Sequence, residues 1–136
     1  MIASLLFVGL EVRQNTAAVR GATYQSIADA SLEQVRWFAD NERLLEFRAR
    51  VEQGALASDF TRVENLLQSA DYVMTIRRIE NIFVQVREGL VEEGAVMRFR
   101  PSVEYFASPY FREFWGLWGP QVEPEFRAYF EREFLD

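Results

Sequence analysis

Apolar side chains recur at intervals of three and four along most of the chain, and this spacing predicts α-helices. The first such stretch predicts one long N-terminal helix over about residues 2–39. Asp40-Asn41 interrupts the pattern and can cap a following helix over about residues 42–53. Gly54 is suited to end that second helix, because glycine adopts the left-handed conformation found just after many helices.

A third stretch of about thirty residues contains neither glycine nor proline. Ser58 is a natural N-cap for it, because the serine hydroxyl can accept a hydrogen bond from an otherwise unpaired first-turn amide. Gly89 follows the last residue of the pattern and suits the left-handed position that ends a helix. We therefore predict one uninterrupted central helix over about residues 58–88.

Two apolar lines run along this central helix on nearly opposite sides. The first consists of Val63, Leu67, Ala70 and Met74, and the second of Tyr72, Ile76, Ile79, Phe83, Val86 and Leu90. A helix that is apolar on both sides packs against neighbours on both sides. We therefore expect the other helices to cover the central helix from two opposite directions.

The C-terminal part is a succession of shorter helices separated by proline and glycine. Breaks or new starts are expected at Pro101, at Ser108-Pro109, at Gly119-Pro120 and at Pro124. The segment 92–100 is a weaker helical candidate that precedes the first of these breaks. Short connections favour antiparallel neighbours. The pattern as a whole predicts an all-α bundle of about five to six helices, in a single domain over residues 1–136.

Composition narrows the chemistry that this domain can perform. The 136 residues are 49% hydrophobic, carry a formal net charge of −6 and include no cysteine or histidine, and all 15 basic residues are arginine. The absence of histidine and lysine excludes a Ser-His-Asp triad, a Schiff-base lysine and a P-loop lysine. The usual zinc ligand sets cannot form without histidine and cysteine. We predict no enzyme activity, no catalytic residues, no metal and no cofactor, and the acidic balance argues against nucleic acid as a partner.

One polar segment interrupts the first apolar line of the central helix. It contains Arg77, Arg78, Glu80 and Asn81. These side chains either meet water, which is the ordinary behaviour of charged residues, or form a partly buried network that is hydrogen-bonded. We treat them as a candidate binding cluster.

Eleven of the 20 aromatic residues lie in the C-terminal tail. One interpretation is that these rings belong to the hydrophobic core, because short helices with an aromatic ring on each turn pack against a bundle by burying those rings. The other is that they border a groove for an apolar or amphipathic ligand. Trp115 and Trp118 are the candidate pocket residues for this second interpretation, together with Arg77 or Asn81.

The first ten residues are nearly all apolar, and helical spacing continues beyond them. The face formed by Leu5, Val8, Val12 and Val19 extends further than a small bundle can cover. Ten residues are too few to span a bilayer, which takes about 20, and no basic segment of a signal peptide precedes them. Residues 1–12 are therefore interpreted either as the remnant of a membrane segment or as a helix end that is buried against other subunits.

Several short motifs resemble a widespread family of uncharacterised bacterial proteins that have one N-terminal membrane-spanning helix followed by a small helical domain. They are the apolar run before Arg13-Gln14-Asn15-Thr16, Arg78-Ile79-Glu80-Asn81 followed by Gly89-Leu90, Ser108-Pro109 before aromatics, and Pro124-Glu125-Phe126. The family has no activity to carry over. This chain differs at the front, where twelve residues precede Arg13. With a membrane segment on that side, Arg13 and Arg20 favour the cytoplasmic face for the domain.

These observations support two functional hypotheses. The first is a non-enzymatic helical interaction domain, tethered or adjacent to a membrane and able to self-associate or bind a protein through its N-terminal helix. The alternative is a module that binds a small apolar or amphipathic ligand among the aromatic C-terminal helices.

Overall fold

The structure, a computed structural model, describes the backbone of residues 2–136 and the side chains of residues 4–136. The prediction of an all-α fold is confirmed, because the described chain consists of helices and connections, with no strand. The helices are α1 Ile2–Ala39, α2 Glu42–Glu52, α3 Arg62–Arg87, α4 Ala95–Phe99, α5 Glu104–Ala107, α6 Pro109–Trp118 and α7 Pro124–Phe134. Two 3-10 turns, η1 Ala57–Asp59 and η2 Gly119–Gln121, lie between them.

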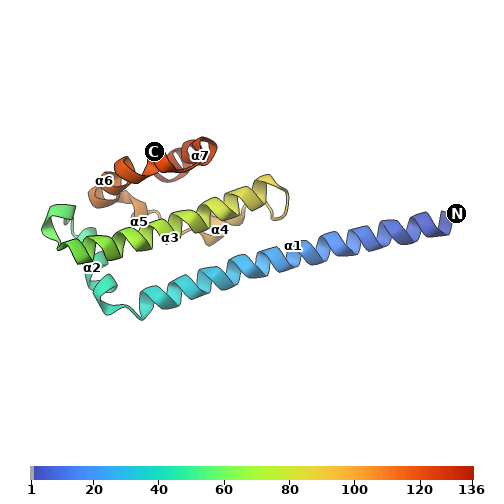
Figure 1. The fold of residues 1–136 in the computed structure, drawn as a ribbon, viewed down its shortest axis with the longest axis horizontal. Helices are drawn as coiled ribbons and strands as arrows, with labels where there is room; N and C mark the ends of the chain where they lie inside the picture. The colour runs from blue at the N-terminus through green and yellow to red at the C-terminus, as the bar shows by residue number, and fades with distance from the viewer. Residues whose placement is uncertain (1) are drawn as a thin grey trace.

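Helix α3 runs through the middle of the molecule (Figure 1). Helix α1 lies along one side of it in the opposite direction, and α6 and α7 lie on another side. The N-terminal half of α1 continues well past the end of α3 as a free rod. At 1.5 Å per residue, the 38 residues of α1 are about 57 Å long.

The first two predicted helices are confirmed close to their expected bounds. The side chain of Asn41 accepts a hydrogen bond from the Leu44 amide at 3.1 Å and so caps α2. Gly54 follows α2 with a φ of +97°, a conformation that residues with a Cβ rarely adopt. The local signals for these boundaries therefore act as the sequence indicates.

The predicted start of the central helix is wrong by four residues. Helix α3 begins at Arg62, and its N-cap is Thr61, whereas Ser58 lies in η1. Thr61 and Glu64 form a capping box, in which the Thr61 hydroxyl accepts from the Glu64 amide and the Glu64 carboxylate accepts from the Thr61 amide at 2.7 Å. The reason is Phe60, which must leave the helical path to stack on Phe47 at 3.8 Å between ring centroids.

Beyond that start, α3 is unbroken through Arg77 and ends where the sequence predicts. Gly89 adopts a φ of +71°, and the amide of Leu90 donates to the Gln85 carbonyl at 2.9 Å. This pairing satisfies a carbonyl that the helix end would otherwise leave open.

The prediction that α3 is covered on two opposite sides is wrong. The second apolar line does face the core, since Tyr72, Ile76 and Ile79 are fully buried. The first line, however, faces solvent, with Val63 68% and Met74 40% exposed. The reason is that α1 and α2 pack on the polar side that contains Asp71, Thr75 and Arg78, about 100° away from the core face. The two covered sides of α3 are thus adjacent.

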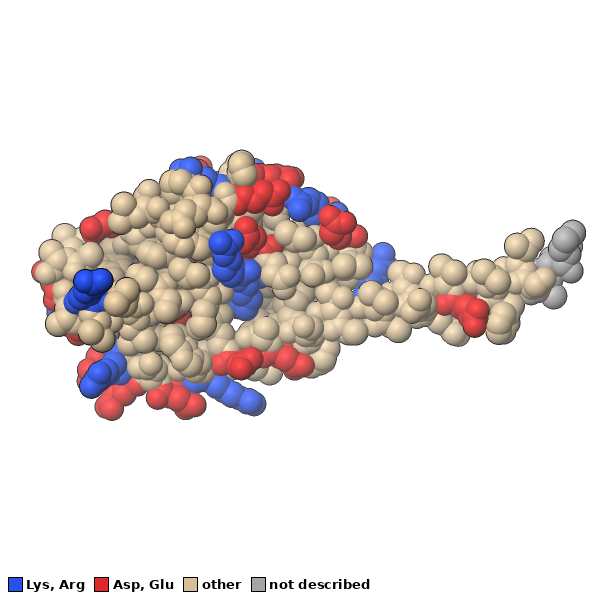
Figure 2. All heavy atoms as spheres, viewed as in Figure 1, with Lys and Arg blue, Asp and Glu red and all other residues tan. Residues whose placement is uncertain are grey.

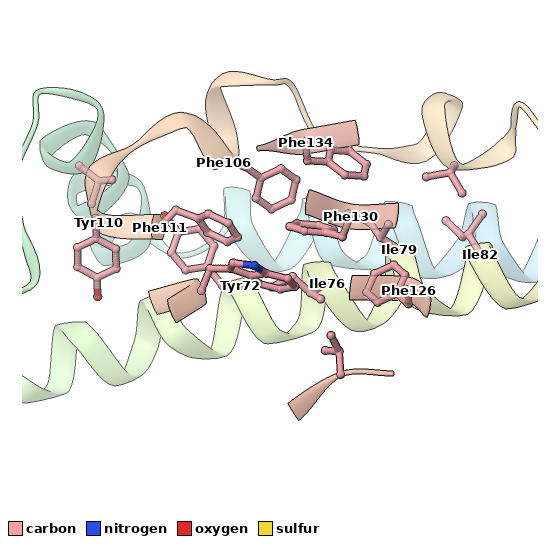
Figure 3. Close-up of a cluster of buried hydrophobic side chains, with 14 of the residues drawn as sticks. Tyr72, Ile76, Ile79, Ile82, Phe106, Tyr110, Phe111, Phe126, Phe130 and Phe134 are labelled. Atoms are coloured by element: carbon pink, nitrogen blue, oxygen red, sulfur yellow. The ribbon is translucent and has the colours of Figure 1, made fainter. Parts of the chain in front are cut away.

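The C-terminal helices contribute most of the core. Phe106, Phe111, Phe126 and Phe130 are fully buried (Figure 3). The Phe106 ring lies 4.8 Å from that of Phe111 and 5.1 Å from that of Phe130, at the edge-on or tilted angles that aromatic pairs favour. The core interpretation of the aromatic tail is confirmed for these residues.

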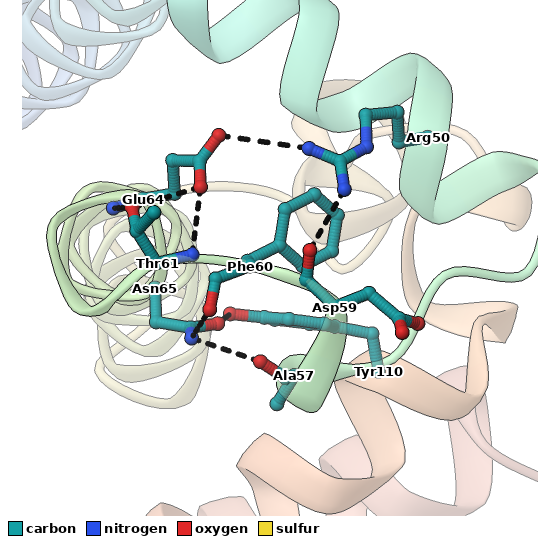
Figure 4. A network of polar contacts seen from close by, with 8 residues as sticks. All are labelled: Arg50, Ala57, Asp59, Phe60, Thr61, Glu64, Asn65 and Tyr110. Atoms are coloured by element: carbon teal, nitrogen blue, oxygen red, sulfur yellow. Dashed lines mark hydrogen bonds and ion pairs between the residues drawn. The ribbon is translucent and has the colours of Figure 1, made fainter.

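A polar network fixes the turn that precedes α3 (Figure 4). The Asn65 side chain donates to the Ala57 carbonyl at 3.0 Å and accepts from the Tyr110 hydroxyl at 2.6 Å. Arg50 donates to the Asp59 carbonyl at 2.8 Å and lies 3.6 Å from the Glu64 carboxylate. These bonds join α2, η1, α3 and α6, and together with the buried ring of Phe60 they fix this connection.

Candidate functional site

The N-terminal half of α1 is an uncovered apolar surface of the described chain. Every side chain over residues 4–22 is exposed, and Ile27 is the first buried side chain of the helix. The large apolar residues in this half are Leu5, Leu6, Phe7, Val8, Leu10, Val12 and Val19, with exposed fractions between 45% and 71%. Figure 2 shows the free part as a thin rod with few charged atoms.

The apolar side chains near the tip surround the helix on all sides. Four of them, Leu5, Leu6, Phe7 and Val8, are consecutive, and at about 100° per residue consecutive positions point in different directions. The predicted face of Leu5, Val8, Val12 and Val19 is therefore one part of a wider apolar surface. No helix within residues 2–136 has the length and hydrophobicity needed to cross a bilayer.

The candidate cluster of Arg77, Arg78, Glu80 and Asn81 does not form one network in the structure. Arg77 and Glu80 form an ion pair at 2.6 Å on the surface, with the Arg77 side chain 51% exposed. Asn81 is also exposed. Arg78 points elsewhere, and its Nη1 donates to Ser31 Oγ at 2.7 Å and to the Phe99 carbonyl at 2.8 Å.

The two candidate tryptophans are part of the C-terminal packing. Trp115 is buried, stacks on Phe130 at 4.5 Å and donates from Nε1 to the Glu131 carboxylate at 3.0 Å. Trp118 is half-buried, and the Arg77 guanidinium lies 5.0 Å from the centre of its ring. This contact is a cation–π interaction, which joins the surface of α3 to the end of α6.

A buried polar network that the sequence does not reveal lies between α1, α2, α3 and α5. Its centre is Asp71 Oδ2, which accepts from Arg48 at 2.7 Å, from the Tyr105 hydroxyl at 2.5 Å and from Gln68 at 3.3 Å. Thr75 extends it, being 3.0 Å from the Tyr105 hydroxyl and accepting from Gln34 at 2.5 Å. Most of its polar groups are paired, as buried polar groups require, whereas Arg48 Nε and Gln68 Oε1 are buried without a hydrogen-bond partner in the described chain.

The electrostatics of the network favour a structural role. Burial, reinforced by the negative charge of Asp71, raises the pKa of the Tyr105 hydroxyl well above its usual range, so that Tyr105 stays protonated and donates. The Arg48 guanidinium lies 3.9 Å from the centre of the Tyr105 ring, which adds a cation–π contact to the ion pair. This network fixes how α1 and α2 lie against α3.

A pocket of about 430 Å³ opens beside this network. Its walls come from the C-terminal half of α1, from α2 and α3, and from the connection between α4 and α5. Its lining residues are Ser31, Gln34, Val35, Phe38, Arg48, Glu52, Asp71, Thr75, Arg78, Arg98, Phe99, Arg100, Pro101 and Tyr105. Below, these residues are called the Arg78 pocket.

Of the sequence-predicted site residues, Arg78 is the one that lines this pocket. Arg77 and Asn81 border a second hollow between α1 and α3, which Trp37 also lines, and Arg78 lines both hollows. The sequence could not indicate the Arg78 pocket, because its walls come from positions up to 74 residues apart. A hint was present in the polar residues Asp71 and Thr75, which occupy helical spacing beside the apolar line of Tyr72 and Ile76.

Comparisons of the chain with protein-family models, with curated proteins and with solved structures gave no match.

Proposed function

We propose that this chain is a non-enzymatic helical interaction domain, held at a membrane surface by the tip of α1. The observation that carries the proposal is the exposed apolar surface around residues 5–10 of that helix. A helix that meets one protein partner usually has an apolar stripe with a polar opposite face, whereas an apolar surface on all sides is typical of lipid contact or deep burial.

The dimensions of the tip are consistent with shallow attachment. Residues 2–10 contain no charged side chain and have a helical length of about 13 Å, close to the thickness of the hydrocarbon of one leaflet, about 15 Å. Full burial of each large apolar side chain contributes roughly 1.5–3 kcal/mol. Arg13 follows the tip and adds attraction to anionic lipids of about 1 kcal/mol, which Glu11 partly offsets. Arg20 lies about 15 Å beyond Leu10 along the helix, where this attraction is largely screened.

Vesicle flotation of the full chain tests this proposal. We expect the chain to float with vesicles of phosphatidylcholine and phosphatidylglycerol, and the double variant Leu6→Glu/Phe7→Glu to stay in solution. The matched control is Val63→Glu/Leu66→Glu, which places the same charges at exposed apolar positions of α3, 68% and 60% accessible, and should float like the parent chain.

Light scattering of the same samples without lipid distinguishes the membrane from a second copy of the chain. A stable dimer that Leu6→Glu/Phe7→Glu dissociates, combined with no flotation of the parent chain, would show that the tip binds another copy. The membrane proposal would then be wrong.

A further inference from the structure

Arg78 has a partly buried charge without an acidic partner. Its guanidinium donates from Nη1 to Ser31 Oγ and to the Phe99 carbonyl, which are both uncharged. Its Nε is buried and has no hydrogen-bond partner within residues 2–136, and Arg78 forms no ion pair there. A guanidinium offers five N–H donors, and a buried charge is stable when it is paired. An anionic oxygen is the partner that this environment lacks.

The hydrogen bond that Arg78 donates to the end of α4 explains only part of the environment of its guanidinium. The bond from Arg78 to Phe99 satisfies a carbonyl at the end of α4, which is a structural role. That bond leaves the Nε atom unpaired, and the pKa of the Arg78 guanidinium is lowered by burial, as expected for a cation that lacks compensation. Arg78 also lines the pocket, and because its Nε is sealed from solvent, a ligand meets the guanidinium at Nη2, which forms no hydrogen bond in the described chain.

The charges around the pocket leave a small positive excess. Four arginines and two acids line it. Arg48 pairs with Asp71, and Arg98 pairs with Glu92 outside the lining. Arg78 and Arg100 remain without an ion pair in the described chain, against the exposed Glu52. A chain with a net charge of −6 therefore has a local site that favours one negative charge.

Part of the remaining wall is apolar. Val35 and Phe38 come from α1, and Phe99 and Pro101 come from the end of α4 and the connection after it. The volume of about 430 Å³ lies within the range of about 300–1,000 Å³ typical of small-molecule sites. A ligand that matches both parts of the pocket has one anionic end and a short apolar body.

We propose that the Arg78 pocket binds a small amphipathic carboxylate, whose head group pairs with the Arg78 guanidinium and whose apolar part lies against Phe38 and Phe99. A carboxylate oxygen can accept a charge-assisted hydrogen bond from the remaining N–H donors of the guanidinium. A dianionic phosphate requires more positive charge than Arg78 and Arg100 supply beside Glu52. This proposal is independent of the membrane contact, because the pocket lies at the other end of α1.

Calorimetric titration of the full chain in lipid-free buffer tests the ligand class. Octanoate is the probe, 1-octanol supplies the apolar body without charge, and acetate supplies the charge without the apolar body. We expect octanoate to bind at least tenfold more tightly than either analogue. Equal binding of 1-octanol, or no binding of octanoate at millimolar concentration, overturns the proposal.

Two neighbouring arginines of α3 provide the matched variants. Arg78→Gln keeps a hydrogen-bonding side chain and removes the charge, and it should weaken octanoate binding at least tenfold. Arg77→Gln removes a charge from the surface ion pair with Glu80 and should change binding less than twofold. Unchanged affinity in a folded Arg78→Gln chain contradicts the assignment of the head-group site.

If circular dichroism shows that Arg78→Gln is unfolded, a second pair of variants tests the ligand site. Val35 lines the pocket and is 64% exposed, so Val35→Glu adds a negative charge at the wall without disturbing the core. Leu32→Glu adds the same charge one turn away on α1, at a position that is 55% exposed and outside the lining. Weaker octanoate binding by Val35→Glu alone supports the proposal, and parental binding by both variants refutes it.

Discussion

The free half of α1 and the C-terminal helices are both rich in large apolar residues, yet they have opposite relations to solvent. Phe7 near the tip of α1 is 64% exposed, whereas Phe130 in α7 is fully buried. The difference lies in the chain around them. Residues 104–134 fold back on α3 in short helices that cover one another, while α1 extends past the last element that could cover it. Hydrophobicity alone therefore does not determine burial; the topology of the neighbouring segments does.

The strongest test of this contrast removes one phenylalanine ring from each region. Phe130→Ala opens a cavity among Phe106, Phe111 and Trp115 and should lower the free energy of unfolding by about 4 kcal/mol. Phe7→Ala should change it by less than about 0.5 kcal/mol, because the ring contacts little in the folded monomer. Urea unfolding followed by tryptophan fluorescence measures both. A similar loss in the two variants would show that the tip of α1 is covered.

A second pair of substitutions locates the boundary within α1 itself. Ile27 is 4% exposed, and Ile27→Ala should cost about 2 kcal/mol, near the lower end for a core isoleucine because it lies at the edge of the core. Val12→Ala, in the free half of the same helix, should be neutral or slightly stabilising, since alanine favours helix more than valine does. The same urea titration measures both variants. A larger loss of unfolding free energy in Val12→Ala than in Ile27→Ala would show that the covered part of α1 extends further towards the N-terminus.

The smallest expected effect concerns the start of α3, where two hydroxyl residues compete as caps. Thr61→Ala should cost about 1 kcal/mol, because it removes the hydroxyl that accepts from the Glu64 amide. Ser58→Ala should cost less than about 0.5 kcal/mol, because Ser58 is exposed and lies outside the helix. Thermal unfolding followed by circular dichroism measures both variants. A larger destabilisation by Ser58→Ala than by Thr61→Ala would show that Ser58 is the N-cap.

The sequence predicts those features that depend on neighbouring residues. The caps at Asn41 and Ser108 and the left-handed glycines Gly54 and Gly89 all occur where the pattern indicates. Ser58 fails as a cap because a tertiary contact, the stacking of Phe60 on Phe47, determines where the chain turns. Local signals identify a set of suitable capping residues, and packing selects among them.

Features that join distant segments could not be predicted in the same way. The packing of α1 against the polar side of α3 depends on Gln34 meeting Thr75 and on Ser31 meeting Arg78, pairs that lie 41 and 47 residues apart. From helical periodicity, we expect the apolar line of Val63 and Met74 to be buried. In the structure that line is exposed, and α1 and α2 cover the polar side of α3, which contains the buried ion pair between Arg48 and Asp71. Within the candidate cluster around Arg77, Arg78 is partly buried, and the sequence does not indicate its partners Ser31 and Phe99.

The continuity of α1 sets a distance between the two sites proposed for this molecule. Phe7 and Gln34 are 27 residues apart on one helix, a separation of about 40 Å along its axis. With the rod upright on a bilayer, the Arg78 pocket stands several Debye lengths beyond the headgroups, since that length is about 8 Å at physiological salt. The surface potential of the lipid does not reach so far, and a carboxylate arriving at Arg78 comes from the surrounding water.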